Sequence, residues 1–313
     1  MTAEKPIIMT LMVRDEADVI AAMIEHHLAQ GIDLIIATDN ASTDGTREIL
    51  SRYAELGVVE LHDDPRLEKQ QAEVVTAMAR RAYTEHGAAW VINADADEFW
   101  FASSGDTVAD ALAKVPASVQ SFDARVRNLV GEPMESGSVL ATHVWRDERS
   151  DEALHAVGLH AHPTQDCVHR GSAHVTVQQG NHGTSLPLSD KVSEASALEV
   201  LHVPYRQWSR YQERVRNTAA AYERSGLSPS PRHHGMRDAR WLEEGVLRPM
   251  FVARHAAAGA TSGLTKDTRV VDSLSRLLDE KRALIPELVE AALEPGEPLP
   301  GIDDDLQLFQ QLG

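Results

Sequence analysis

The stretch WVINADADEF at residues Trp90–Phe99 joins a short apolar run to a pair of aspartates. A compact apolar run predicts a strand buried on both faces, as in a parallel sheet. Asp95 and Asp97 follow the run directly, two residues apart, so both side chains can address one cation. Because Mg²⁺ and Mn²⁺ prefer carboxylate and phosphate oxygens, the stretch predicts a divalent-metal site at a strand end. The competing interpretation is a solvated acidic turn, since an isolated D-x-D is common.

The chain on the N-terminal side of this stretch alternates apolar runs with segments of helical spacing. This alternation predicts an α/β fold with a parallel, doubly wound sheet flanked by helices. In sheets of this kind, ligands bind at the carboxyl ends of the strands. The predicted strands are Ile7–Val13, Leu34–Ala37, Val58–Leu61 and Trp90–Asn93, and the predicted helices are Asp15–Gln30, Asp44–Leu56 and Leu67–His86.

All four predicted strand ends carry acidic side chains. Because these ends meet at one edge of a parallel sheet, we expect the side chains to lie close together. The turn at Asp39–Gly45 has a second interpretation, because Ser42 or Thr43 can cap the helix that starts near Asp44. The acidic residues at the strand ends are Asp15 and Glu16, Asp39, Asp63 and Asp64, and Asp95 and Asp97.

The alternation of strands and helices ends after Trp100. A short helix at Val108–Val115 and a strand at Val119–Val126 are predicted there, followed by an irregular stretch at 128–190. The last part of the chain has helical spacing. The tail from Glu294 is rich in Pro, Gly and Asp, so we expect it to be loosely ordered. We therefore predict a sheet domain at residues 1–205 and a helical C-terminal extension at 206–313. Its helices are predicted at Trp208–Ser225, Met236–Ala258 and Val270–Leu293.

The 313 residues carry a formal net charge of −18. Such an acidic surface repels nucleic acid and anionic membrane, so neither is expected as a partner. Cys167 is the only cysteine, which excludes an intrachain disulfide. No apolar run approaches the ~20 residues that span a bilayer, and the first residues lack the pattern of a signal peptide. The expectation is a cytoplasmic protein without an integral membrane segment.

Several short motifs follow one another in a fixed order along the chain. In order and spacing they resemble the branch of the glycosyltransferase family 2-like group that has R-N/D-E-A, D-N-x-S-x-D and D-A-D-E-F elements. The similarity is dense over residues 7–101, patchy over 165–216 and absent from the C-terminal third. The motifs are VRDEA at Val13–Ala17, then His27 and Gly31, DNASTD at Asp39–Asp44, DADEF at Asp95–Phe99, GNH at Gly180–His182 and LHVPYR at Leu201–Arg206.

The resemblance implies a GT-A fold, a nucleotide-sugar donor and a divalent cation, Mn²⁺ or Mg²⁺. It implies that Asp39 contacts the nucleoside and that Asp95 and Asp97 hold the sugar nucleotide and the metal. A histidine further along the chain is expected to complete the metal shell. His202 is preferred and His182 is its rival. The other donor-site candidates are Val13, Arg14, Glu16, Lys69, Gln71 and Arg206.

His202 is preferred because Arg206 follows four residues later and can meet the diphosphate. The chain also departs from the branch at one place. Where a lysine would precede the pair His169-Arg170, this chain has Asp166-Cys167-Val168, so a diphosphate contact from that lysine is lost. Further arginines, Arg210, Arg214 and Arg216, crowd the first half of the helix predicted from Trp208. We expect Arg206 and then Arg210 to face the diphosphate or an anionic acceptor, and the others to pair with surface carboxylates.

The expected reaction moves a sugar to an acceptor hydroxyl that the sequence does not identify. A carboxylate would deprotonate this hydroxyl if the mechanism is inverting. Asp147 and Glu148 are candidates for that base, and a charged loop explains them equally well. The alternative function is a non-catalytic nucleotide-sugar binder or scaffold. A retaining glycosidase is disfavoured, because it needs no strand ends suited to a diphosphate.

Overall fold

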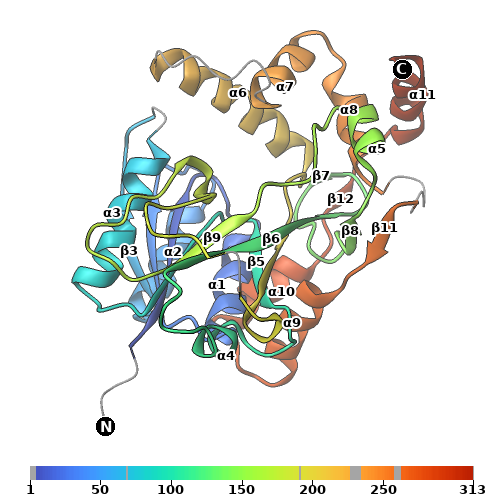
Figure 1. The fold of residues 1–313 in the computed structure, drawn as a ribbon. Coiled ribbons are helices and arrows are strands. Elements are labelled where there is room, and N and C mark those ends of the chain that lie inside the picture. Colours follow the sequence, from blue (N-terminus) through green and yellow to red (C-terminus); the bar gives the residue numbers. More distant parts are fainter. Residues whose placement is uncertain (1–4, 68–69, 190–191, 226–233, 257–261, 313) are drawn as a thin grey trace.

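The computed structural model describes residues 5–67, 70–189, 192–225, 234–256 and 262–312. Its centre is a ten-stranded sheet with the main strand order β11-β8-β6-β9-β4-β1-β2-β3, and a second sheet pairs β12 with β7. Helices α6 and α7 lie at the end of the molecule away from the N-terminus (Figure 1). The predicted α/β class is confirmed.

The N-terminal half of the sheet is parallel, in the order β3-β2-β1-β4. The predicted strands and connecting helices are confirmed, with some ends shifted. The first helix begins at Ile20 and not at Asp15, because Asp15 has a φ of 57°, which a right-handed helix does not accommodate. The elements are β1 (Ile7–Val13), α1 (Ile20–Ala29), β2 (Leu34–Asp39), α2 (Thr46–Glu55), β3 (Val59–Asp63), α3 (Gln71–Thr84) and β4 (Trp90–Ala94).

The continuous apolar run of β1 follows from its position between two layers of helices. Met9 and Leu11 belong to the same apolar cluster as the α1 side chains, whereas Ile8 packs with Val75 and Met78 of α3. Successive side chains of a strand point to opposite faces, so a strand covered on both sides needs apolar residues throughout. The strand ends are therefore the nearest places for polar groups.

The other half of the sheet is mostly antiparallel. β9 pairs antiparallel with β4 and β6, while β10 pairs antiparallel with β5 and parallel with β6. Short elements also occupy much of the stretch 128–190, so the expectation that it is irregular is wrong in part; strands this short leave little pattern in a sequence. The elements are β5 (Glu98–Ala102), α4 (Val108–Ala113), β6 (Ser121–Val130), β7 (Met134–Ser136), β8 (Trp145–Asp147), α5 (Asp151–Ala156), β9 (Asp166–Arg170), η1 (Gln179–Asn181), η2 (Glu194–Ser196) and β10 (Leu198–His202).

Helix α6 (Trp208–Ser225) has the predicted bounds, but each of the two later predicted helices is divided. Gly245, with a φ of 76°, separates the first pair, and Lys281, with a φ of 55°, ends the first helix of the second pair. Left-handed residues end right-handed helices, so the prediction of two long helices is wrong. The pairs are α7 (His234–Glu243) and α8 (Leu247–Arg254), and α9 (Arg269–Asp279) and α10 (Pro286–Leu293). The predicted break at Ser228–Pro231 lies outside the described residues.

The C-terminal tail is ordered, contrary to expectation. It forms β12 (Glu297–Pro298), which pairs with β7, and α11 (Ile302–Leu312), which packs on α8, while β11 (Leu264–Lys266) pairs with β8. Leu274 of α9 and Val289 of α10 share an apolar cluster with α1. These helices therefore contribute to the same core as the sheet, and the division at residue 205 stays a prediction.

Candidate active site

Asp95 and Asp97 lie between β4 and β5, where the chain leaves the parallel half of the sheet. The antiparallel pairing of β10 with β5 sets His202 opposite Glu98. This register brings the Nε2 atom of His202 to 3.5 Å from Oδ1 of Asp97. The strand pairing thus joins two motifs that lie about a hundred residues apart in the sequence.

Basic side chains surround Asp97. Besides His202, Nη1 of Arg214 lies 3.6 Å from its Oδ2. Burial opposes the ionisation of Asp97, but the charges of His202, Arg206 and Arg214 together hold its pKa below the usual range. Asp97 is therefore an ionised carboxylate, the form that a hard cation binds. His202 is held in place by Asn128, whose Oδ1 lies 3.1 Å from the Nδ1 atom of the ring.

Asp95 lies among amides and acids. Gln71 and Asn181 each donate a side-chain hydrogen bond to its Oδ1, at 3.2 Å and 3.1 Å. Burial, followed by the negative charges of Asp97 and Asp166, raises the pKa of Asp95 to about 6. The sequence predicts Gln71 as a donor-site residue, and the structure places it beside Asp95.

The two candidate histidines have different partners. His202 faces Asp97, whereas Nδ1 of His182 lies 3.0 Å from Oδ1 of the buried Asp166. Within the described residues, no group of three or more His, Cys, Asp and Glu side chains has the arrangement of a metal site. A cation near Asp97 would then take most of its ligands from the substrate and water, which is common for Mg²⁺.

The loop after β1 is held by the turn that follows β2. Ser42 Oγ accepts the backbone N–H of Asp15 at 2.9 Å, and Thr46 Oγ1 accepts that of Glu16 at 2.7 Å. Asp44 fixes Thr46 in turn, because its Oδ1 accepts the backbone N–H of Thr46 at 3.0 Å. The D-N-x-S-x-D motif therefore shapes the loop that carries Glu16, and Asp44, not the expected Ser42 or Thr43, accepts the first backbone N–H of α2.

Asp39, at the end of β2, keeps one acceptor free. Its Oδ2 accepts the backbone N–H of Ser42 at 3.2 Å, while its Oδ1 is buried and has no hydrogen-bond partner. A buried acceptor without a donor is costly unless a ligand supplies one. Val13 contributes its carbonyl oxygen, which accepts the backbone N–H of Asn40 at 2.8 Å. The neighbouring Arg14 has a buried Nε without a hydrogen bond.

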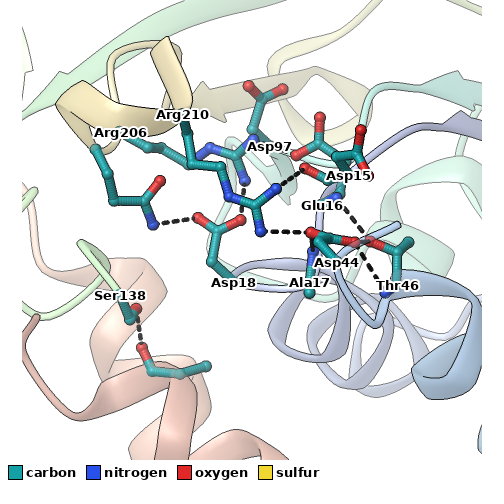
Figure 2. A network of polar contacts seen from close by, with 12 residues as sticks. Asp15, Glu16, Ala17, Asp18, Asp44, Thr46, Asp97, Ser138, Arg206 and Arg210 are labelled. Carbon is teal, nitrogen blue, oxygen red and sulfur yellow. Dashed lines mark hydrogen bonds and ion pairs between the residues drawn. The ribbon is translucent and has the colours of Figure 1, made fainter. Parts of the chain in front are cut away.

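A network of arginines and carboxylates covers the loop (Figure 2). Arg206 donates to Glu16 and, at 2.9 Å, to Oδ1 of Asp18, and Arg210 donates to Oδ2 of Asp44 at 2.6 Å. Burial raises the pKa of Glu16 to about 7 although the charge of Arg206 opposes the shift. Both hydrogen-bond partners of Arg206 are acidic side chains of this chain, so the expected contact of Arg206 with a diphosphate stays a prediction.

A cavity of about 240 Å³ opens between this loop and α6. Four arginines contribute to its wall, so this acidic protein gathers several cations around one cavity. Arg214 connects the cavity to Asp97, which it contacts at 3.6 Å. Among the residues that line the cavity are Arg14, Glu16, Asn40, Arg206, Arg210 and Arg214.

The structure does not bring Asp147 and Glu148 to this cluster. Asp147 is buried and accepts hydrogen bonds from the Nε and Nη2 atoms of Arg149 at 2.9 Å and 2.7 Å. Glu148 pairs with Arg146 and Thr265, and the hydrogen bond from Thr265 heads the causes that lower its pKa. Within the described part of the chain, no hydrogen bond or ion pair joins either carboxylate to Asp95 or Asp97. Lys69 lies outside the described residues.

Several residues of the site were not predicted. Asp18, Asn128 and Asp166 each hold a predicted residue in place. Two of the residues carried a signal, because Asn181 stands inside the GNH motif and Asp166 stands where the chain departs from the branch. The others are identified by contacts between distant segments, which spacing along the chain does not reveal.

Residues 8–133 match the sequence model of glycosyltransferase family 92. The match confirms the predicted resemblance to glycosyltransferases and, with it, the class of the protein, a transferase enzyme. The motifs themselves resemble the family 2-like group, whereas the matching sequence model is that of family 92. Both are groups of glycosyltransferases, so the two findings agree on the class of enzyme. The matched segment includes Asp39, Asp95 and Asp97. Comparison with curated protein sequences gave no match.

Solved structures with a partly similar course include two glycosyltransferases. Staphylococcus aureus TarS 1–349 in complex with UDP shows 10% identity and a TM-score of 0.40, with 98% of this chain and 92% of that chain covered. Glucosyl-3-phosphoglycerate synthase from Mycobacterium tuberculosis, in complex with Mn²⁺, UDP and glucosyl-3-phosphoglycerate, shows 14% identity and a TM-score of 0.30, with 54% and 57% covered. Likeness at this level carries no argument about the ligands of this chain.

Proposed function

We propose that this protein transfers a sugar from a nucleotide-sugar donor to an acceptor hydroxyl, with inversion and with the help of a divalent cation. The observation that carries the proposal is the ionised Asp97 beside His202, next to a cavity with arginines in its wall. A diphosphate needs cations around it, and this acidic chain gathers them here. A cytoplasmic location, which the single cysteine favours, belongs to the same proposal.

The donor set fits a hard cation. Asp97 and His202 would hold Mn²⁺ or Mg²⁺, with Asp95 near them and His182 as the rival histidine. When bound, the cation would neutralise charge that develops on the leaving diphosphate. One or two carboxylates with substrate phosphates are the usual ligands of such ions.

The residues of the chain itself would bind and orient the donor. The free Oδ1 of Asp39 is an acceptor for a donor group of the nucleoside. Arg14 and Arg214, which line the cavity, offer guanidinium groups to phosphate oxygens. Arg206 would act mainly by holding the loop after β1, because Glu16 and Asp18 already occupy its guanidinium.

A donor panel tests this proposal. Purified protein is incubated with UDP-, GDP- and ADP-sugars, with Mn²⁺ or with a chelator, and release of nucleoside diphosphate is measured. Calorimetry measures binding of the same nucleoside diphosphates under both conditions. We expect one donor to be consumed only with the cation. Equal binding with Mn²⁺ and chelator would contradict the metal role. Tight cation-dependent binding without donor consumption would support the non-catalytic binder instead.

No helix in the described part of the chain combines the length and apolarity needed to cross a membrane. Asp147 and Glu148 are both held by arginines, so another residue is needed as the base that deprotonates the acceptor hydroxyl.

A further inference from the structure

The GNH motif forms a sharp turn beside Asp95. Gly180 has a φ of 78° and Asn181 a φ of 64°, so two successive residues adopt the left-handed conformation. Asparagine is among the few residues besides glycine that tolerate it. A Cβ atom added at Gly180 would lie only 2.8 Å from Nε2 of His182. The glycine therefore provides both the conformation and the room for the imidazole ring.

The turn delivers two side chains in different directions. The amide of Asn181, which is buried, donates to Oδ1 of Asp95 at 3.1 Å. The ring of His182 lies 3.0 Å, through Nδ1, from Oδ1 of Asp166, whose side chain is 1% exposed on β9. The side chain of His182 is 43% exposed, and Nδ1 is the ring nitrogen that faces Asp166.

A histidine with one nitrogen on a buried carboxylate has a fixed orientation and tautomer. Nδ1–H donates to Asp166, and the lone pair of Nε2 then points away from it. The hydrogen bond that His182 donates to Asp166 also raises the pKa of His182, which strengthens the ring as a base. Asp166 itself stands in the segment where this chain departs from the glycosyltransferase branch that its motifs resemble.

We propose that His182 is the general base of the transfer reaction and that Asp166 is its positioning residue. This inference rests on the proposed function. Nε2 of His182 takes the proton of the acceptor hydroxyl as the oxygen forms its bond to the anomeric carbon of the sugar. The bond from that carbon to the diphosphate oxygen breaks, and its electron pair leaves with the nucleoside diphosphate. His182 then releases the proton to water.

His202 and His182 would therefore have different roles in the site. His202 contacts Asp97 and belongs with the metal-binding groups, whereas His182 is held by Asp166, with no hydrogen bond or ion pair to Asp97 in the described part of the chain. A metal ligand and a base give opposite results when each is replaced. This difference makes the inference testable apart from the proposed function.

The test uses His182→Gln, which keeps the side-chain size but takes up no proton, and His174→Gln as the matched control. His174 is an exposed histidine of the same segment. Binding of nucleoside diphosphate with Mn²⁺ is measured by calorimetry, and donor consumption is measured with water or an acceptor as the nucleophile. For His182→Gln we expect unchanged binding and a loss of turnover of ~10²-fold or more. The control should match the wild type in both.

Further variants separate the outcomes. Asp166→Asn should lower kcat less than His182→Gln does, and leave KM for the donor unchanged. In His182→Gly, added imidazole should restore part of the lost turnover. Loss of Mn²⁺-dependent binding in His182→Gln would show a metal ligand and overturn the inference, as would unchanged turnover. A wild-type protein that binds no nucleoside diphosphate and consumes no donor would overturn the proposed function, and this inference with it.

Discussion

The two sides of the site differ although their central carboxylates are two residues apart. On one side, Asp97 faces His202 and Arg214, and its pKa is held low. On the other, Asp95 faces the amides of Gln71 and Asn181, and its pKa is raised to about 6. Both are removed from water, which alone would raise both values. The difference lies in whether cations or acids surround the carboxylate.

We propose that this contrast gives the two sides different tasks. A carboxylate among cations is ionised and suits a metal or a charged substrate. A carboxylate among amides and acids is suited to orienting neutral groups, such as the hydroxyls of a sugar. The D-x-D pattern is therefore one motif with two environments, and each environment comes from a different distant segment.

The largest expected effect follows from removing the charge on the cationic side. Asp97→Asn should lower donor turnover by ~10²–10³-fold, because His202 and the arginines lose the carboxylate that they surround. Most of the Mn²⁺-dependent part of nucleoside diphosphate binding should be lost with it. Calorimetry with and without chelator measures this part.

The matched control is Asp63→Asn, an exposed carboxylate at the end of β3 that pairs with Arg47. It removes the same charge from another strand end of the same sheet and should leave cation-dependent binding as in the wild type. If both variants lost binding equally, the contrast between Asp97 and the other acidic strand ends would be wrong.

The second effect concerns stability on the same side. Arg206→Met leaves Glu16 and Asp18, both largely buried, without their cation, and should cost about 3 kcal/mol of unfolding free energy. Arg214→Met removes a half-exposed partner of Asp97 and should cost less than about 1 kcal/mol. Urea denaturation at pH 7 measures both.

Donor binding should respond in the reverse order once folding is accounted for. Arg214 lines the cavity with part of its guanidinium exposed, whereas Arg206 is engaged by two carboxylates. From the sequence alone, Arg206 is expected to face the diphosphate and Arg214 to pair with surface carboxylates. A folded Arg206→Met protein with lost donor affinity, beside an Arg214→Met protein with normal affinity, would restore that assignment.

The sequence predicted the parallel half of the fold because each feature there is local. The apolar run of β1 is buried on both faces and needs no partner to be recognised. The breaks in the C-terminal helices were missed for the opposite reason. Lys281 has a positive φ, and the carboxylate of Glu25 accepts the backbone N–H groups of Leu284 and Ile285 at 3.0 Å and 2.8 Å. That interaction crosses more than 250 residues, so no window along the chain contains it.

The site shows the same limit. Asp39 and the two aspartates after β4 were predicted because strand ends gather in a parallel sheet. The partners that set their chemistry come from β9, β10 and α6. Asp166 lies where the sequence departs from a motif of the branch. The residues next to it in the sequence still do not indicate that it accepts a hydrogen bond from His182. Candidate residues were therefore predictable, and their roles were not.

A third effect tests the acidic side. Asp95→Asn keeps an oxygen that can accept from Gln71 and Asn181, and it removes repulsion from Asp97 and Asp166. We expect the unfolding free energy at pH 7 to stay equal or rise by about 1 kcal/mol, while donor turnover falls less than in Asp97→Asn. Urea denaturation and the donor assay measure the two quantities. A large loss of stability would mean that the charge of Asp95 is compensated by a group not identified here.

The smallest expected effect concerns histidines that have no acid beside them. Burial lowers the pKa of both His169 and His26 to about 4. In contrast, the hydrogen bond to Asp166 raises the pKa of His182. In the unfolded chain a histidine titrates near 6.5. Between about pH 6.5 and 4 the unfolded state therefore binds protons that the folded state does not, so stability is present above this range and falls as the pH falls through it.

His169→Gln should remove one such group and reduce the dependence of unfolding free energy on pH in this range by up to about 1.4 kcal/mol per pH unit. Urea denaturation at several pH values measures the slope, with the exposed His174→Gln as the control that should leave it unchanged. His182→Gln should change the slope only above about pH 6.5, and in the other direction, because the folded pKa of His182 is the higher one and its contribution is lost as the pH rises through it. If the unfolding free energy had the same dependence on pH in all three variants, the presence or absence of an acidic partner would not decide the charge of a histidine in this protein.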